Sequence, residues 1–177
     1  PFWLVFFRVS IAALTLHFYL TARGQWTTFR SVPFLPFLGL GLLNNAIPFS
    51  LIFLGQTVIG AGLASILNST TPFLTVIAAN MLTSDERASP LKIAGTLLGI
   101  AGAAVIVGPA ALSGLGAPIW AELAIIGAAL SYALASIYAK RFKSVPPLIT
   151  ATGQLTASTL LMLPVAFGAA DVPMTIV

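Results

Sequence analysis

Long apolar runs alternate with short polar connections along the whole chain. A bilayer core of about 30 Å is crossed by about 20 residues of helix. Six apolar runs come close to that length: Phe2–Leu20, Phe34–Leu54, Ile59–Met81, Leu91–Gly108, Ile119–Ala139 and Leu148–Phe167. The connections between them carry Gly, Pro, Ser and charged residues, which are typical of helix ends and loops. The pattern therefore predicts six membrane-spanning helices.

The composition excludes a water-soluble fold. Hydrophobic residues make up 58% of the chain and charged residues 7%, and the mean hydropathy is +1.03. Soluble domains carry about 25% charged residues. Because there are too few charges to cover a soluble surface, the predicted fold class is all-α, a polytopic membrane helix bundle.

Composition also limits the chemistry. The chain has no Cys, which excludes disulfides and thiolate metal ligands, and one His, which excludes the HExxH metalloprotease pattern. The net charge of +4 does not indicate nucleic acid, because the basic residues lie at helix ends. We predict no metal and no cofactor. Since the chain starts at Pro1, directly on an apolar run, we expect it to be a fragment of a longer protein.

The basic residues predict an orientation. With the positions next to them, the first, third and fifth connections hold two, two and three Lys or Arg, and the second and fourth hold none: Arg23, Arg30, Arg87, Lys92, Lys140, Arg141 and Lys143. Loops rich in Lys and Arg stay in the cytoplasm. The first, third and fifth connections are therefore expected inside, and both ends of the chain outside.

The first and last runs resemble each other weakly. At an offset of 146 residues, Pro1 aligns with Pro147 and Arg8 with Gln154. The predicted orientation makes the two runs point in opposite directions, as in transporters built from inverted repeats. For such copies we expect Arg8 and Gln154 at similar membrane depth, facing the same central space.

The third and fourth runs carry a more specific likeness. The stretch GQTVIGAGLASILNSTTPFLTVIAANMLTSDERASPLKIAGTLLGIAGAAVIVG combines small residues at a helix start, a polar residue before a Pro, Glu86 in a loop and a Gly-rich closing helix. With Arg8 and the LLNNAIPFSLIF of the second run, it resembles EamA-type members of the drug/metabolite transporter superfamily.

That resemblance implies ten helices in two inverted halves of five, of which the six runs would be helices two to seven. Residues 1–110 would then end the first repeat, 111–118 would form an external linker, and 119–177 would begin the second repeat. The resemblance also implies a secondary transporter that moves small metabolites, amino acids or drugs across the inner membrane by alternating access, most often outward. The implied partners are a small-molecule substrate and the lipid bilayer, and a homodimer is compatible with the sequence.

The stretch SILNSTTP interrupts the third run with polar residues. At 100° per residue, one stripe holds the polar and small side chains: Ser65, Asn68, Ser69, Pro72, Thr75 and Ala79. The opposite side is apolar and is expected to face lipid: Leu63, Ile66, Leu67, Leu74 and Ile77. Pro72 removes one backbone donor and frees the carbonyl of Asn68, which neighbouring hydroxyls can satisfy. The polar stripe either forms hydrogen bonds that hold a kinked helix against its neighbours, or marks a hinge whose polar side lines a cavity.

The second run carries two adjacent amides before a proline. Asn44 shares a stripe with Pro48, and Asn45 points about 100° away. Asn44 is therefore the better cavity candidate, and Asn45 is expected to bond a neighbouring helix. Arg8 is the charge deepest within a run, and it either lines a cavity or forms an interfacial or structural contact.

These arguments give one set of candidate residues. The substrate-cavity candidates are Arg8, Asn44, Asn45, Asn68, Ser69, Pro72 and Gln154, and the hinge candidates are Pro48 and Pro72. An intramembrane enzyme or a structural membrane scaffold is the alternative function. A channel is disfavoured because no filter-like loop or ring of charge is present. The energy source stays open: proton coupling would use His17 or residues outside the chain, and facilitated exchange needs neither.

Overall fold

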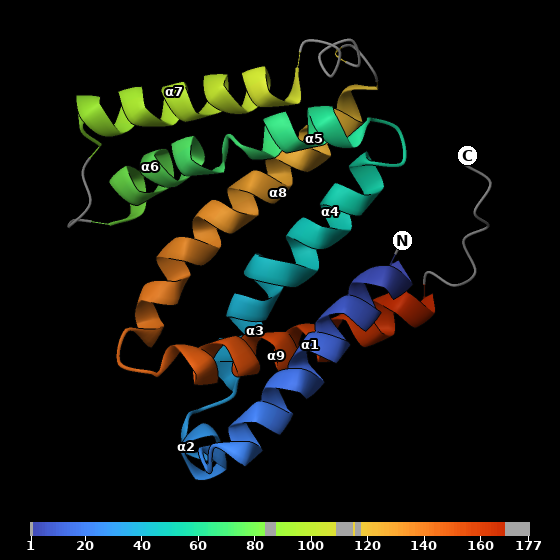
Figure 1. Ribbon diagram of the computed structural model, residues 1–177, viewed down its shortest axis with the longest axis vertical. Coiled ribbons are helices and arrows are strands. Elements are labelled where there is room, and N and C mark those ends of the chain that lie inside the picture. The colour runs from blue at the N-terminus through green and yellow to red at the C-terminus, as the bar shows by residue number, and fades with distance from the viewer. Residues whose placement is uncertain (1, 84–87, 109–114, 116–117, 169–177) are drawn as a thin grey trace. The chain divides into compact units, whose positions relative to one another are not determined.

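A computed structural model describes residues 2–83, 88–108, 115 and 118–168, and every regular element in these ranges is helical (Figure 1). The elements are α1 (Phe2–Ala22), α2 (Trp26–Ser31), α3 (Leu35–Gly41), the π-helix η1 (Leu42–Ala46), α4 (Ile47–Gly55), α5 (Ala61–Asn68), α6 (Thr71–Leu82), α7 (Pro90–Val107), α8 (Ile119–Tyr138), the 3₁₀ helix η3 (Ala139–Phe142) and α9 (Pro147–Gly168). Glu86, and the predicted linker 111–118 except for 115 and 118, lie outside the described residues.

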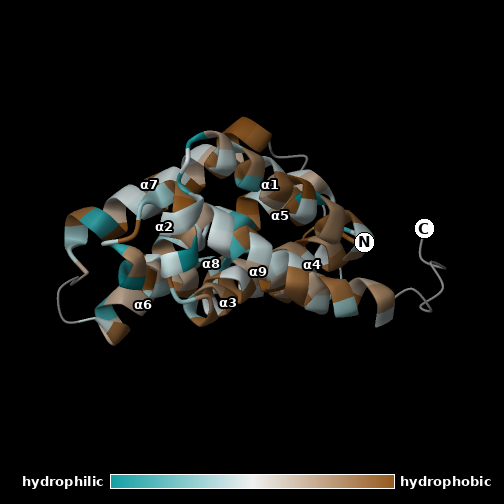
Figure 2. Ribbon diagram, turned by 90° about the horizontal axis from the view of Figure 1, so that it is seen from below, coloured by the Kyte–Doolittle hydropathy of each residue, from teal (hydrophilic) through white to brown (hydrophobic). Residues whose placement is uncertain are grey.

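The six predicted spans are confirmed. Six helical stretches among the described residues are long and apolar enough to cross a membrane: Phe2–Ala22, Leu35–Gly55, Ala61–Leu82, Pro90–Val107, Ile119–Phe142 and Pro147–Gly168. The largest boundary difference is at the end of the fifth span, Phe142 in place of the predicted Ala139. Figure 2 shows hydrophobic residues, in brown, along the helices. Large apolar side chains such as Phe18, Leu91 and Ile106 are at least 77% exposed, as expected where lipid is the solvent.

The chain forms two compact units, Pro1–Ser50 with Tyr138–Val177, and Leu51–Ile137. In the first unit α1 and α9 lie along each other (Figure 1). They run antiparallel, because Trp3 contacts Phe167 at a ring distance of 4.9 Å while His17 is 2.8 Å from Thr156. The buried positions of α1 recur at helical spacing: Val5, Val9, Ala13 and Leu20.

An aromatic side chain joins α3 to α9. Phe37 is 1% exposed and lies against Gly153, where an added Cβ would be 2.5 Å from the ring. The same ring stacks on Phe142 at 5.0 Å. Gly153 therefore lets a phenyl ring pack directly on the α9 backbone, which fixes α3 and the segment after it against α9.

The second unit has its own small core. Buried apolar side chains from the start of the third span meet those of α8: Ile59, Leu63, Ala64, Ala121 and Ile125. Gly55, at the end of α4, also packs directly on α8, since an added Cβ would be 2.9 Å from the Ala121 carbonyl oxygen.

The predicted lipid-facing side of the third span is wrong in its first half. Leu63 is 2% exposed and Ile66 is 8% exposed, whereas Ser65 is exposed. The reason is that this side of α5 packs on α8 in the small core, and the break between α5 and α6 lets the two halves of the span bury different sides.

Candidate functional site

The second span contains a π-helical turn at its two amides. The N–H of Ile47 donates to the carbonyl of Leu42, five residues back, and Asn44 and Asn45 lie within this turn. Pro48 follows at once, has no N–H and crowds the carbonyl of Asn44 one turn before it. The wider turn relieves that crowding. A hinge was predicted at Pro48; the structure has a π-bulge just before it.

The bulge lies directly against α9. An added Cβ at Gly41 would be 2.7 Å from the Gln154 carbonyl oxygen and 2.9 Å from Ser158 Oγ. No side chain larger than hydrogen fits there without movement of the α9 backbone. Because Gly41 has no side chain, the bulge can approach α9 closely enough for its amides to form hydrogen bonds with α9.

Four side chains meet at this contact, and we call them the polar cluster: Asn44, Asn45, Gln154 and Ser158. Asn45 is 5% exposed, and its Nδ2 donates to Ser158 Oγ at 2.9 Å. Asn44 Nδ2 donates to Gln154 Oε1 at 3.3 Å. The Ser158 hydroxyl lies 2.7 Å from the Gln154 carbonyl and 3.2 Å from that of Gly41. The cluster therefore links residues more than a hundred positions apart in the sequence.

The cluster keeps unused hydrogen-bonding capacity. Among the described residues, no hydrogen bond is formed by Asn44 Oδ1 or Gln154 Nε2, and both residues are half-buried. An amide pair has two donors and one acceptor on each side chain. After the one bond between them, three N–H donors and the Asn44 Oδ1 acceptor are left for a water molecule or a ligand, in the way that polar groups orient a ligand in an apolar pocket.

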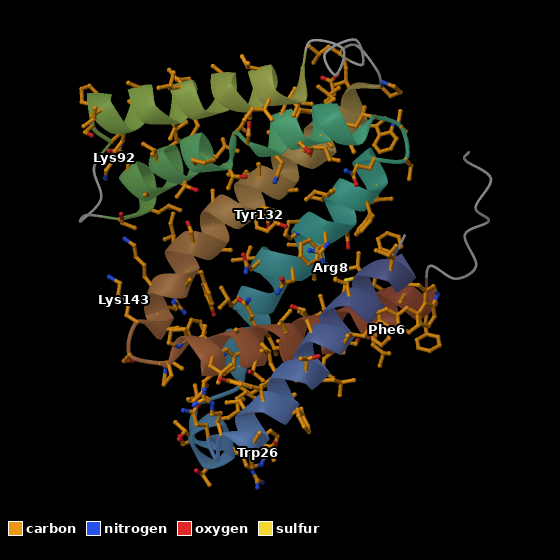
Figure 3. The ribbon with its side chains drawn as sticks, viewed as in Figure 1. Phe6, Arg8, Trp26, Lys92, Tyr132 and Lys143 are labelled. Carbon is orange, nitrogen blue, oxygen red and sulfur yellow. The ribbon has the colours of Figure 1, made fainter. Side chains whose placement is uncertain are left out.

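Gln154 also lines a cavity of about 380 Å³ in the first unit. Its lining is Ala139, Phe142, Lys143, Val145, Pro147, Thr150, Ala151 and Gln154. Lys143 is exposed and carries the positive charge of this cavity (Figure 3). The cavity can therefore admit a small molecule with polar or negatively charged groups next to Gln154.

Arg8 does not join the polar cluster. Its guanidinium lies 4.7 Å from the ring centroid of Phe49 on α4, an energetically favourable cation–π contact (Figure 3). Among the described residues no hydrogen bond or ion pair connects Arg8 to Asn44 or Gln154.

The expectation that Arg8 and Gln154 share a depth is wrong. Since α1 and α9 are antiparallel, Gln154 lies near the His17 end of α1, while Arg8 is nine residues earlier, about 13 Å along the helix axis. Inversion about an axis in the membrane plane exchanges the two membrane halves. Arg8 and Gln154, which are equivalent positions near the starts of α1 and α9, therefore lie in opposite halves of the membrane.

The third span breaks at the stretch SILNSTTP, as the position of Pro72 predicts. Three consecutive hydroxyls each donate to the carbonyl three residues back: Ser69 to Ile66 at 2.6 Å, Thr70 to Leu67 at 2.6 Å and Thr71 to Asn68 at 2.7 Å. The carbonyl that Pro72 leaves without its usual partner is the one that Thr71 satisfies.

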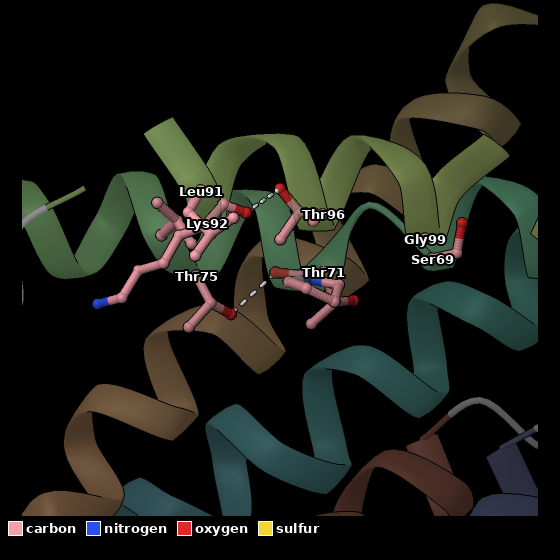
Figure 4. Close-up of a pocket in the computed structure, with 10 residues that line it drawn as sticks. Ser69, Thr71, Thr75, Leu91, Lys92, Thr96 and Gly99 are labelled. Atoms are coloured by element: carbon pink, nitrogen blue, oxygen red, sulfur yellow. Dashed lines mark hydrogen bonds between the residues drawn. The ribbon is translucent and has the colours of Figure 1, made fainter. Parts of the chain in front are cut away.

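A groove runs along this break within the second unit (Figure 4). Its volume is about 720 Å³, and its lining is Ser69, Thr71, Pro72, Thr75, Val76, Leu91, Lys92, Gly95, Thr96 and Gly99. Asn68 Oδ1 is buried and bonds to no described residue. The structure thus brings Ser69 and Pro72 together at one groove, while Asn68 is not part of its lining.

Sequence reasoning missed Ser158 and Gly41 as members of the first contact. Ser158 lies one helical turn after Gln154, so its place on the same face was readable from the sequence. Gly41 gave no signal beyond its position one turn before the amides. The sequence did not indicate that the amides of Asn44 and Asn45 face α9.

The fold and the site define a polytopic α-helical membrane protein with polar groups inside its apolar bundle. The family model of the EamA-like transporter family matches residues 1–108. The chain belongs to this family, whose members are membrane transporters.

Comparison with solved structures gives the same fold. A crystal structure of another protein superposes on this chain with a TM-score of 0.74 at 23% sequence identity, covering 100% of this chain and 60% of that one. The chain thus spans 60% of the length of that protein. No curated protein matches the chain.

Proposed function

We propose that the protein is a secondary transporter that exports small zwitterionic or anionic molecules, amino acids among them, by alternating access. The observation that carries the proposal is the polar cluster. Asn44 and Gln154 come from two helices, bond each other at 3.3 Å and keep a donor and an acceptor unused. Polar side chains within a membrane bundle are costly without partners, so an incompletely paired set favours a role in binding.

The charge of the first unit favours the substrate class. Its described residues include no Asp or Glu, while Arg8 lies in α1 and Lys143 lines the cavity beside Gln154. A cavity lined by Lys143 and by no carboxylate, in a unit whose described charges are all positive, attracts carboxylate groups and disfavours organic cations. The amides then provide N–H donors and one carbonyl acceptor for the remaining polar groups of the substrate.

The two interruptions of helical geometry support alternating access. At the π-bulge before Pro48 and the break before Pro72 the regular backbone hydrogen bonding is already interrupted, so a change of helix direction disrupts fewer bonds there than elsewhere in the spans. The antiparallel pair α1 and α9 is consistent with inverted repeats, with α9 as the counterpart of α1 in a second half. An inner-membrane location with outward transport completes the proposal.

The experiment is an export assay with a matched set of variants. Cells that express the intact protein are loaded with each amino acid in turn, with organic anions and with organic cations, and efflux is followed. We expect export of one or more zwitterions or anions. Asn44→Leu and Gln154→Leu should each abolish it at normal membrane abundance, and the double variant should lose no more, because the two side chains act as a pair.

Thr159→Val is the control on the same helix. Thr159 donates only to the Leu155 carbonyl of its own helix, at 2.9 Å, so its loss should leave export unchanged. If no compound in the panel is exported above the level of cells without the protein, the transport proposal is wrong. If Asn44→Leu and Gln154→Leu export normally, the polar cluster is a packing contact and not a substrate site.

A further inference from the structure

His17 lies in an aromatic enclosure where α1, α2 and α9 meet. Its ring contacts the rings of Trp26 and Phe29 of α2 edge-on, at centroid distances of 5.3 and 5.2 Å. On the other side its Nε2 is 2.8 Å from Thr156 Oγ1 of α9. This histidine therefore contacts the two elements packed against its own helix.

The hydrogen bonds determine where the ring carries its proton. The Thr156 hydroxyl donates to the Thr152 carbonyl at 2.7 Å, and a hydroxyl has only one proton to donate. With that bond formed, the same oxygen accepts towards His17 and Nε2 carries the hydrogen. The opposite assignment is disfavoured because it would leave Nδ1 as a buried N–H without an acceptor. In the neutral ring Nδ1 is then an acceptor, and it is buried and bonds to no described residue.

A second proton on the ring does not fit this arrangement. It would create a buried N–H at Nδ1 without an acceptor, on a ring that had become a cation. The titratable and charged groups on the packed elements are Arg8 and Tyr19 on α1, Arg23 in the turn after α1 and Arg30 on α2, and α9 carries none. Arg23 donates to the Tyr19 hydroxyl at 2.7 Å. No described carboxylate of this unit is present to balance an imidazolium.

We propose that His17 is the proton-binding site that couples transport to the proton gradient. In the enclosed arrangement the ring is neutral, and a proton binds to the Nδ1 lone pair only when the contact between α1, α2 and α9 opens to water or to an acceptor. Binding of the proton and opening of this contact are then linked equilibria. The inference rests on the proposed transport function, and it names the proton as the ion whose gradient drives that transport.

Two variants separate proton binding from a general effect of substitution in α1. His17→Gln keeps a side-chain donor towards Thr156 but takes up no proton. Thr15→Val removes an exposed hydroxyl that donates to the Ile11 carbonyl of its own helix at 2.8 Å, and it leaves the surroundings of His17 unchanged. The intact protein and both variants are placed in lipid vesicles, and uptake of single radiolabelled amino acids is measured in two modes, exchange at equal pH and net accumulation driven by a pH gradient.

The proposal predicts that the variants differ by mode. With one proton exchanged per substrate, a gradient of two pH units drives accumulation of up to about 100-fold, since each unit is a factor of ten. His17→Gln should keep exchange and lose this accumulation, and Thr15→Val should keep both. Equal accumulation in His17→Gln and the unaltered protein would overturn the proposal. So would loss of exchange in His17→Gln, because that result indicates a structural histidine.

A second measurement tests proton binding without transport. Protonated histidine quenches a neighbouring tryptophan, and Trp26 is the ring beside His17. Emission of the purified protein should change as the pH is lowered, and the change should be absent from His17→Gln. Identical titrations of the two proteins would overturn the proton site. Failure of the unaltered protein to carry any amino acid, with the emission change present, would count against the transport proposal and leave the proton site supported.

Discussion

Replacement of Gly41 by Ala tests the contact on which the candidate site depends. An added Cβ would lie 2.7 Å from the Gln154 carbonyl oxygen, 2.9 Å from Ser158 Oγ and 3.0 Å from the Ser158 nitrogen. Two of these atoms belong to the α9 backbone and cannot rotate away. The π-bulge and α9 must therefore move apart, which lengthens the bonds that Asn44 and Asn45 make to α9.

The magnitude follows from two contributions. Overpacking costs about 1–3 kcal/mol, and each side-chain hydrogen bond between membrane helices contributes about 0.6 kcal/mol. Loss of two such bonds brings the destabilisation to about 2–4 kcal/mol. For a chain of this size we expect the melting temperature in detergent to fall by about 5–15 °C. Export should fall in parallel, because the donor and acceptor of the polar cluster lose their positions.

Two other glycines provide graded controls. At Gly39 an added Cβ would meet the Tyr138 hydroxyl at 2.7 Å, the far end of a side chain that can rotate, so Gly39→Ala should be milder. At Gly102 nothing lies within 4 Å, so Gly102→Ala should be neutral or slightly stabilising. Melting curves and export rates of the three variants give the order. If Gly41→Ala melts and transports like Gly102→Ala, the close contact between the bulge and α9 does not exist as described.

Three further predictions concern charge, orientation and the helix break. Arg8→Gln should reduce export of anionic or zwitterionic substrates far more than Arg8→Lys does, and equal loss with reduced membrane abundance would show a structural arginine. Because the chain has no Cys, single cysteines can report its orientation: Gln56→Cys should react with an impermeant thiol reagent from outside and Ser144→Cys should not, and the reverse pattern would overturn the orientation. Thr71→Val removes the donor that satisfies the Asn68 carbonyl at 2.7 Å and should destabilise the protein by about 0.6–1.7 kcal/mol, whereas Thr71→Ser should not; equal melting of the two would refute the role of this hydroxyl.

The spans could be predicted from the sequence because a membrane restricts which backbone structures can cross it. Each apolar run must be helical to satisfy its backbone, and its length fixes where the helix ends. The break before Pro72 was readable for a related reason, since a proline and its neighbouring hydroxyls have a defined effect on specific carbonyls. These are local interactions, set by residues within one turn of each other.

Features that depend on a second helix were not readable. The bond from Asn45 to Ser158 requires the knowledge that α9 lies against the bulge, and no spacing in either segment encodes this. The sides assigned to Leu63 and Ile66 were wrong because a helical wheel assumes an unbroken axis. The depth assigned to Gln154 was wrong for a geometric reason, since inversion exchanges the two membrane halves.

The three hydroxyls at the break between α5 and α6 have a consequence for the speed of motion. Ser69, Thr70 and Thr71 already hold the three carbonyls that an intact helix would bond to backbone N–H groups. Bending at this point opens the backbone bonds from Ser69 N–H to the Ile66 carbonyl (3.1 Å) and from Thr70 N–H to the Leu67 carbonyl (3.2 Å), but the hydroxyls keep both carbonyls bonded. The activation enthalpy of bending is therefore smaller than in a helix without these hydroxyls. A conformational step that uses this joint should slow only modestly on cooling, so its rate would stay high at temperatures where bond-breaking rearrangements become limiting.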